Sequence, residues 1–174
     1  MRFILGFILA FSSNAFGAPA EFTKSNNTVR WHAVGTPGFL RIDGKGGAAE
    51  GVLNTAISKV SGVLTVALSD YKTGISLRDE HMKSKYLDVG KYPTAKLEIK
   101  DQPYAEGVEG KMAGVLTLKD VSKPVTISFK VTGKKVSANF KINIRDYPSI
   151  GVPVYLGVTV ADEVEITVDA TTTP

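Results

Sequence analysis

The sequence predicts an all-β domain of eight antiparallel strands with one short helix. From residue 28 onward, apolar and polar residues alternate with a period of two, which is the pattern of a strand with one buried and one solvated face. Antiparallel sheets tolerate a wet face, whereas parallel sheets are usually covered on both faces. Glycine and proline separate these runs, and one segment has helical spacing instead.

The expected strands differ in how regular their alternation is. The run Val125, Ile127, Phe129 and Val131 is among the clearest, because a polar residue separates each pair. Earlier runs are less regular, and we expect Leu64 to lie on the inner face of its strand. In chain order, the eight expected strands cover residues 28–34, 38–43, 60–68, 95–100, 111–118, 125–132, 136–144 and 163–169.

Turn residues support this order. Gly133-Lys134 separates two alternating runs and predicts a short hairpin. The stretches Gly35–Gly38 and Gly44–Gly51 are expected to be loops because they are rich in glycine. Residues 145–157 contain two prolines and two glycines without clean alternation, so a long loop is expected there.

The segment Arg78–Leu87 breaks the alternation and predicts the helix. Met82 and Tyr86 are one turn apart, and Asp79 is of a residue type that often caps a helix N-terminus. Eight antiparallel strands can close into a barrel that is filled by side chains or holds one small ligand. A two-sheet sandwich fits the same periodicity. A membrane barrel is disfavoured because aromatic residues, which form its girdles, are only 9% of the chain.

Composition excludes several kinds of chemistry. The chain has no cysteine, so thiol nucleophiles and thiolate metal sites are absent. His32 and His81 are the only histidines and have no ligand-like spacing, so we expect neither a metal nor another cofactor. No G-x-S-x-G motif occurs, and an enzyme is disfavoured. The net charge of +4 comes without a basic run, which disfavours nucleic-acid binding and suits solubility or anionic ligands.

The N-terminus predicts export. Arg2 precedes an uncharged apolar run, and Ala15-Phe16-Gly17 resembles a cleavage site. We expect residues 1–17 to be a signal peptide and residues 18–174 to be one domain, with cleavage after Ala20 as the alternative. No other stretch is long enough to span a membrane as a helix.

Three blocks of sequence carry a resemblance to a known family. The first is Thr73–Lys83, which reads T-G-x-x-x-R-D-x-H and is followed by Tyr92-Pro93. The second joins Gly114–Leu118 to Ser122–Val125, and the third covers Arg145–Ile166. Together they resemble the YceI-like family of bacterial periplasmic proteins, from about residue 60 to residue 169.

The resemblance implies a lipocalin-like antiparallel barrel whose elongated apolar interior holds a polyisoprenoid or similar long-chain amphiphile, without enzyme activity. It implies a periplasmic location, with an extracellular one as the alternative. Three positions depart from the family pattern: residues 27–34 lack the usual His-Ser pair, Asp120 replaces a common glycine, and the late Arg-x-Asp-aromatic-Gly element is altered at Arg145–Gly151. These departures concern the mouth of the expected pocket.

Candidate ligand contacts follow from the inward faces and the family blocks. The expected apolar lining comprises Trp31, Phe39, Leu64, Val66, Leu97, Ile99, Leu116, Ile127, Phe129, Phe140 and Ile142. Arg78, Asp79, His81 and Arg145 are candidates for binding a ligand head group or for anchoring the helix, since arginine can bind a phosphate or carboxylate through two hydrogen bonds.

Two functions are therefore considered. The first is a periplasmic protein that sequesters or transports an isoprenoid or fatty lipid, with no nucleic-acid partner and no integral membrane span. The second is a non-enzymatic envelope interaction or stress protein whose barrel is filled by side chains. A homodimer is compatible with either.

Overall fold

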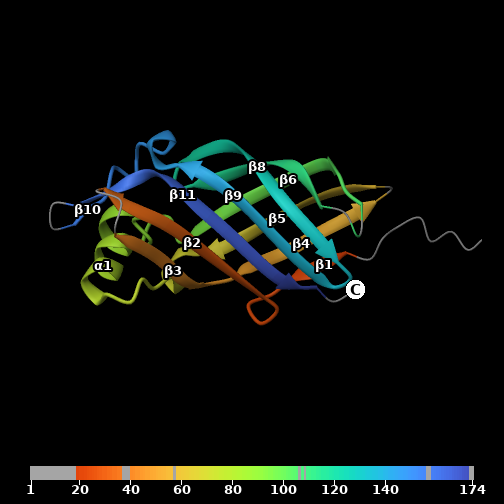
Figure 1. The fold of residues 1–174 in the computed structure, drawn as a ribbon, viewed down its shortest axis with the longest axis horizontal. Coiled ribbons are helices and arrows are strands. Elements are labelled where there is room, and N and C mark those ends of the chain that lie inside the picture. Colours follow the sequence, from red (N-terminus) through yellow and green to blue (C-terminus); the bar gives the residue numbers. More distant parts are fainter. Residues whose placement is uncertain are drawn as a thin grey trace, which may run out of the picture.

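The computed structural model describes residues 19–36, 40–56, 58–105, 107, 109–155 and 158–172. The expected signal peptide and Phe39 lie outside these residues. The described residues form eleven strands in one antiparallel sheet (Figure 1). The strands are β1 (Ala20–Phe22), β2 (Asn27–Thr36), β3 (Arg41–Gly47), β4 (Ala49–Ala56), β5 (Lys59–Ala67), β6 (Thr94–Pro103), β7 (Glu109–Leu118), β8 (Val121–Thr132), β9 (Lys135–Asn143), β10 (Val154–Tyr155) and β11 (Val158–Thr171).

The sheet curls into a barrel-like shape. Ten strands follow the order β1-β4-β5-β6-β7-β8-β9-β11-β2-β3, and β10 pairs with β11. An amide side chain joins β2 and β4, the strands next to the two edges of this path: buried Asn27 of β2 donates from Nδ2 to the Ala49 carbonyl of β4 at 2.8 Å and accepts from the Ala49 N–H at 2.7 Å. Two backbone hydrogen bonds between Lys45 and Lys72, of 2.9 and 2.8 Å, tie β3 to the segment after β5.

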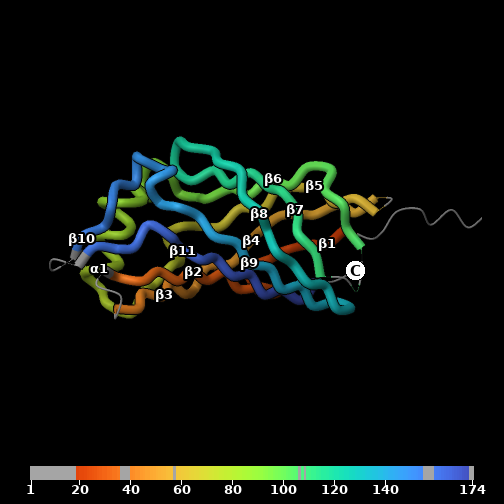
Figure 2. Tube along the Cα trace, turned by 45° about the horizontal axis from the view of Figure 1, so that its top comes forward, coloured from red at the N-terminus to blue at the C-terminus, as the bar shows by residue number. Residues whose placement is uncertain are grey.

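The helical elements cover one end of this barrel. The α-helix α1 (Ser76–His81) continues into a π-helical turn, η2 (Met82–Tyr86), and short 3₁₀ turns occupy Leu68–Asp70 and Ile144–Asp146. Both Figure 1 and Figure 2 place α1 and β10 at the same end, and Figure 1 marks the C-terminus at the other. No helix among the described residues is long and apolar enough to cross a membrane.

The prediction of an all-β fold with a short helix is confirmed, but the count of eight strands is wrong. All eight expected strands are present in part or whole, and β1, β4 and β10 are additional. The expected loop Gly44–Gly51 is instead the end of β3 and the start of β4. Glycine is needed within these strands because a side chain would clash with a neighbour: a Cβ at Gly44 would lie 1.9 Å from Nε1 of Trp31.

The helix also differs in detail from its prediction. It begins at Ser76 rather than Arg78, and its N-cap residue is Ile75, which makes no side-chain capping bond. Asp79 is therefore not the N-cap. Its carboxylate instead accepts hydrogen bonds from Thr73, in the loop that precedes the helix. The last part of the expected helix is the π-helical turn η2, a rare geometry that is frequent at functional sites.

In the described part of the core, one buried side-chain hydroxyl has no hydrogen-bond partner. The Tyr147 side chain is fully buried, and its hydroxyl has no hydrogen-bond partner among the described residues. Burial, assisted by the charge of Asp146, raises the pKa of Tyr147 to about 12. An unpaired buried hydroxyl costs about 1–3 kcal/mol.

We therefore expect Tyr147→Phe to leave the free energy of unfolding unchanged or to raise it by about 1 kcal/mol. Urea unfolding of the two proteins in the same buffer measures this difference. A loss of more than about 1 kcal/mol would show that the hydroxyl has a bonding partner in solution.

Candidate functional site

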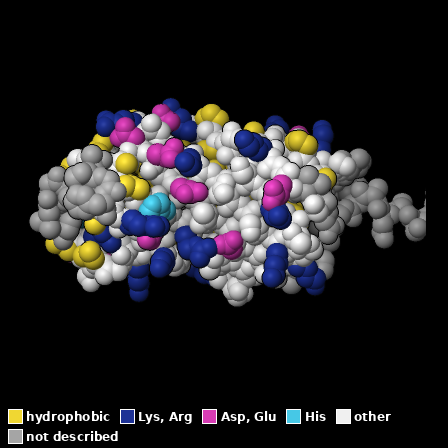
Figure 3. Space-filling model, viewed as in Figure 1, with side chains coloured by type: hydrophobic (Ala, Val, Ile, Leu, Met, Phe, Trp, Pro, Cys, Tyr) yellow, Lys and Arg dark blue, Asp and Glu magenta, His cyan; other side chains and the backbone are white. Residues whose placement is uncertain are grey.

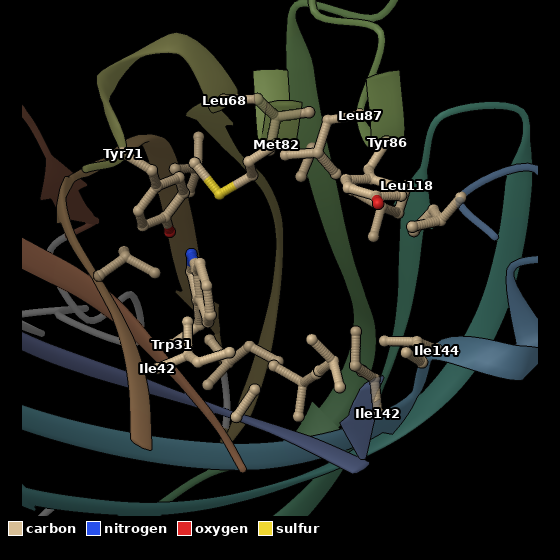
Figure 4. Close-up of a pocket in the computed structure, with 18 of the residues that line it drawn as sticks. Trp31, Ile42, Leu68, Tyr71, Met82, Tyr86, Leu87, Leu118, Ile142 and Ile144 are labelled. Atoms are coloured by element: carbon tan, nitrogen blue, oxygen red, sulfur yellow. The ribbon is translucent and has the colours of Figure 1, made fainter. Parts of the chain in front are cut away.

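An apolar cavity occupies the end of the barrel that α1 and η2 cover. Its volume is about 240 Å³. Figure 4 shows side chains from opposite walls pointing into this one space. The strand walls contribute Val29, Trp31, Ala33, Ile42, Ala49, Leu64, Val66, Ala95, Leu97, Leu116, Leu118, Phe140, Ile142, Val160, Val164, Ile166 and Val168.

Two aromatic rings form one side of this cavity. Trp31 of β2 lies across Gly44, its register partner on β3. Tyr71 lies across Gly47, where a Cβ would be 2.4 Å from the ring. Burial raises the pKa of Tyr71, so its hydroxyl stays neutral and the wall carries no charge there. The two glycines let β3 approach both rings, which positions them against the cavity.

The segment 76–86, termed the lid, closes the cavity from above. Met82, Tyr86 and the following Leu87 point into it (Figure 4). The Tyr86 hydroxyl accepts from the Val154 N–H at 3.2 Å and donates to the Val154 carbonyl at 3.3 Å. Lys119 Nζ donates to the carbonyls of Tyr86 at 3.1 Å and Ser149 at 2.6 Å. These bonds join the lid directly to β10 and, through Lys119 of the β7–β8 turn, to the loop before β10.

Three polar residues line the cavity beneath the start of the lid, namely Thr73, Arg78 and His81. Arg78 donates from Nε to the Thr73 hydroxyl at 2.8 Å and from Nη2 to the Thr73 carbonyl at 2.7 Å. Thr73 in turn donates its hydroxyl and its N–H to Asp79. Arg78 and Asp79 thus meet through Thr73. Within the described residues, Arg78 Nη1 and the His81 ring make no hydrogen bond and are available to a ligand.

The structure brings together most of the predicted site residues. Trp31, Leu64, Val66, Leu97, Leu116, Phe140 and Ile142 line the cavity. Ile99, Ile127 and Phe129 are buried in the closely packed core and are not part of its lining. Arg145 is also outside the cavity, because its Nε pairs with Asp162 Oδ2 at 2.6 Å on the surface.

Sequence reasoning missed several lining residues. Leu68, Tyr71, Leu87, Leu118 and Ile144 line the cavity from turns and strand ends. The helical spacing of Met82 and Tyr86 was the one signal of a lid that faces inward. Residues in turns escape period-two reasoning because their side-chain directions do not alternate.

The Asp79 carboxylate makes the contacts between the lid and Thr73 sensitive to acid. Burial raises its pKa, but donation by the Thr73 hydroxyl and N–H outweighs burial, and the net pKa lies below the ordinary value. A carboxyl whose pKa is depressed by folding stabilises the fold above its unfolded pKa of about 4, and this contribution is lost as the pH falls through the folded value.

We therefore expect protection of the lid from hydrogen exchange to fall below about pH 4 in the native protein. Asp79→Asn should remove most of this pH dependence, because an amide does not titrate. Glu109→Gln is the matched control, since the pKa of Glu109 is also lowered, by Lys130, but on the barrel wall. Equal pH profiles for the native protein and Asp79→Asn would contradict the assignment.

The fold and the site define a class of protein: a barrel-like antiparallel sheet with an apolar cavity beneath a helical lid. The family model of the YceI-like domain matches residues 21–172 of this chain. The chain therefore belongs to the YceI-like family, as its sequence blocks suggested.

Curated relatives match part of the chain. A UPF0312 protein of Pseudomonas paraeruginosa is 38% identical over 82 residues, which are 47% of this chain and 41% of that protein. A UPF0312 protein of Yersinia enterocolitica is 41% identical over 85 residues, with the same coverage of 47% and 41%. The chain thus matches only 41% of the length of these relatives.

Solved structures share the fold. The crystal structure of Burkholderia cenocepacia BcnA is 19% identical with a TM-score of 0.68, and the match covers 86% of this chain and 98% of that one. A polyisoprenoid-binding domain from Saccharophagus degradans, described as implicated in plant cell wall breakdown, is 13% identical with a TM-score of 0.63 and coverage of 87% and 95%. At these identities the similarity shows a shared fold and nothing more.

Proposed function

We propose that this protein binds a long-chain isoprenoid or similar amphiphilic lipid inside its barrel, for sequestration or transport in the bacterial periplasm, and that it is not an enzyme. The observation that carries this proposal is the apolar cavity beneath the lid, about 240 Å³ in volume. The description of the S. degradans domain as polyisoprenoid-binding indicates the class of ligand to test first.

Burial of a hydrocarbon chain can supply the affinity. Each buried CH₂ contributes about 0.8 kcal/mol, so ten carbons contribute about 8 kcal/mol. That corresponds to a Kd on the order of 1 μM before the costs of ordering the chain are subtracted. Sites for drug-sized ligands usually have volumes of about 300–1,000 Å³. The cavity of about 240 Å³ is smaller than this range, so a long chain needs more space than the cavity now offers.

The head group of such a lipid would lie beside Arg78 and His81. These two side chains and Thr73 lie together in the cavity lining at the start of the lid. Arg78 is held in place by Thr73, and its Nη1 donates to no acceptor among the described residues. A phosphate, carboxylate or carbonyl oxygen is the acceptor that suits this arrangement.

A second candidate is an envelope interaction protein with a filled barrel. The cavity favours the lipid-binding candidate, because a filled barrel would carry packed side chains at the lid end as it does around Phe129. The two candidates differ in whether a hydrophobic molecule leaves the protein with organic solvent.

The test is to purify the protein under native conditions, extract it with organic solvent and analyse the extract by mass spectrometry. We expect a co-purified prenyl or fatty lipid, and saturable uptake of a fluorescent polyprenyl or fatty probe by the extracted protein. Trp31 is the single tryptophan and lines the cavity, so its emission should change on uptake. If no lipid co-purifies and the protein takes up no probe, the proposal is contradicted.

Export is part of the proposal. Ala20 pairs with Leu53 of β4 and packs against the core, so cleavage after Gly17 would keep β1 whole, whereas cleavage after Ala20 would shorten it. We expect N-terminal sequencing of the periplasmic protein to begin at Ala18. A start at Met1 in protein recovered from the periplasm would contradict a cleaved leader.

A further inference from the structure

The lid end of the barrel exposes apolar side chains. Among the described residues, the three most exposed large hydrophobic side chains are Val154 at 52%, Leu77 at 49% and Ile75 at 43%. Ile75 and Leu77 lie at the start of α1, and Val154 lines the cavity and bonds to Tyr86. Figure 3 shows hydrophobic side chains at this end of the molecule. Exposed apolar side chains therefore lie at the lid end, beside the cavity.

The chain segment that contains the lid carries an excess of positive charge. The segment 71–92 contains five cations against three anions, namely Lys72, Arg78, Lys83, Lys85 and Lys91 against Asp79, Glu80 and Asp88. Asp79 accepts from Thr73, and Arg78 donates to Thr73. The four lysines make no ion pair within the described residues, while Lys96, Lys130 and Lys141 on the barrel wall are paired with glutamates. Lys85 lies over the Tyr86 ring and Lys91 over the Tyr92 ring, at 5.6 and 5.0 Å from the ring centroids, and such contacts with aromatic faces leave the ammonium charge in place.

Exposed aliphatic side chains beside lysines that make no ion pair in the described part of the chain are the pattern of a surface that lies in a membrane interface, with the lysines at anionic head groups and the aliphatic side chains below them. We propose that the lid end docks on an anionic lipid bilayer, with Ile75, Leu77 and Val154 inserted at the head-group boundary. This proposal rests on the proposed function, because docking lets a lipid chain pass between bilayer and cavity without exposure to water.

Vesicle co-sedimentation tests this proposal. The native protein should bind vesicles of phosphatidylcholine with phosphatidylglycerol, lose binding as salt rises, and bind phosphatidylcholine alone weakly. The double variant Ile75→Thr/Leu77→Gln should reduce binding about tenfold, because two apolar side chains no longer insert. Lys85→Gln/Lys91→Gln should also weaken binding and reduce its salt dependence.

Matched variants control for loss of hydrophobicity and charge elsewhere. Val52→Thr/Val63→Thr removes an exposed cross-strand apolar pair from the barrel wall, and Lys59→Gln/Lys135→Gln removes two exposed lysines at strand starts. Both should bind vesicles as the native protein does. Equal binding by the native protein and the Ile75→Thr/Leu77→Gln variant would overturn the proposal.

A second measurement separates failure of docking from failure of lipid binding. The Ile75→Thr/Leu77→Gln variant should take up a short-chain fluorescent fatty acid from aqueous solution as the native protein does, but extract a long-chain probe from vesicles about tenfold more slowly. Uptake from solution without any vesicle binding by the native protein would overturn docking and leave lipid binding intact. A change from dimer to monomer in this variant, with vesicle binding unaltered, would assign the surface to self-association and overturn docking.

Discussion

Substitution of Ala33 by phenylalanine is expected to reduce probe binding at least about tenfold while the barrel remains folded. Ala33 of β2 is 1% exposed and lines the cavity. Its cross-strand partners, Ile42 of β3 and Val164 of β11, line the cavity as well. A phenyl ring at this position therefore has space in one direction only, which is the volume that the lipid chain would occupy.

The measurement is a fluorescence titration with a fatty probe, combined with thermal unfolding. Ala95→Phe enters the same cavity from β6 and tests the result independently of Trp31, which lies two residues from Ala33. Ala113→Phe is the control, because Ala113 of β7 is exposed on the outside of the barrel. Unchanged probe affinity in both Ala33→Phe and Ala95→Phe, with folding intact, would place the ligand elsewhere.

The inward faces of the strands were predictable from the sequence because a strand's side-chain direction depends only on its own alternation. Ile127, Phe129, Phe140 and Ile142 were all expected to point inward, and all four are buried. Strong alternation predicts that one face of a strand is buried, and this prediction does not depend on which residues pack against that face.

The number of strands was not predictable, because the missed strands lack that alternation. The stretch from Gly44 to Gly51 contains four glycines, which usually indicate a loop. Two of them, Gly46 and Gly51, have positive φ values of 98° and 142° within strands. The reason for Gly44 and Gly47 is the close approach of Trp31 and Tyr71, which come from other parts of the chain.

The extent of the cavity could not be predicted from the sequence either. The alternation of apolar and polar residues is the same at both ends of a strand. It therefore predicted that Leu97 and Ile99 of β6 both line the cavity, but only Leu97 does. Which end is hollow depends on the curl of the sheet and on the lid. Arg78 and His81 of the sequence motif line the cavity, whereas Arg145 lies outside it in a 3₁₀ turn and pairs with Asp162 of β11, a partner that the sequence alone does not identify.

The two ends of the barrel should respond differently to the same truncation. Phe129 and Phe140 are buried to a similar degree, with exposed fractions of 9% and 6%. Phe129 stacks on Tyr104, with ring centroids 6.4 Å apart, and its ring leaves no room for a Cβ at Gly110, which would lie 2.9 Å from Cζ. Phe140 borders the cavity and has fewer neighbours to lose on that side.

We expect Phe129→Ala to lower the free energy of unfolding by about 3–5 kcal/mol, and Phe140→Ala by about 1–3 kcal/mol, because a side chain beside an existing cavity loses fewer dispersion contacts. The first loss is a large fraction of the total stability of about 5–15 kcal/mol that a domain usually has. Urea unfolding measures both values. Probe titration of the folded fraction should find native affinity in Phe129→Ala and altered affinity in Phe140→Ala. Equal losses of stability with unaltered probe affinity in both variants would mean that the lid end is packed as closely as the other end, and would favour the filled barrel over the lipid-binding one.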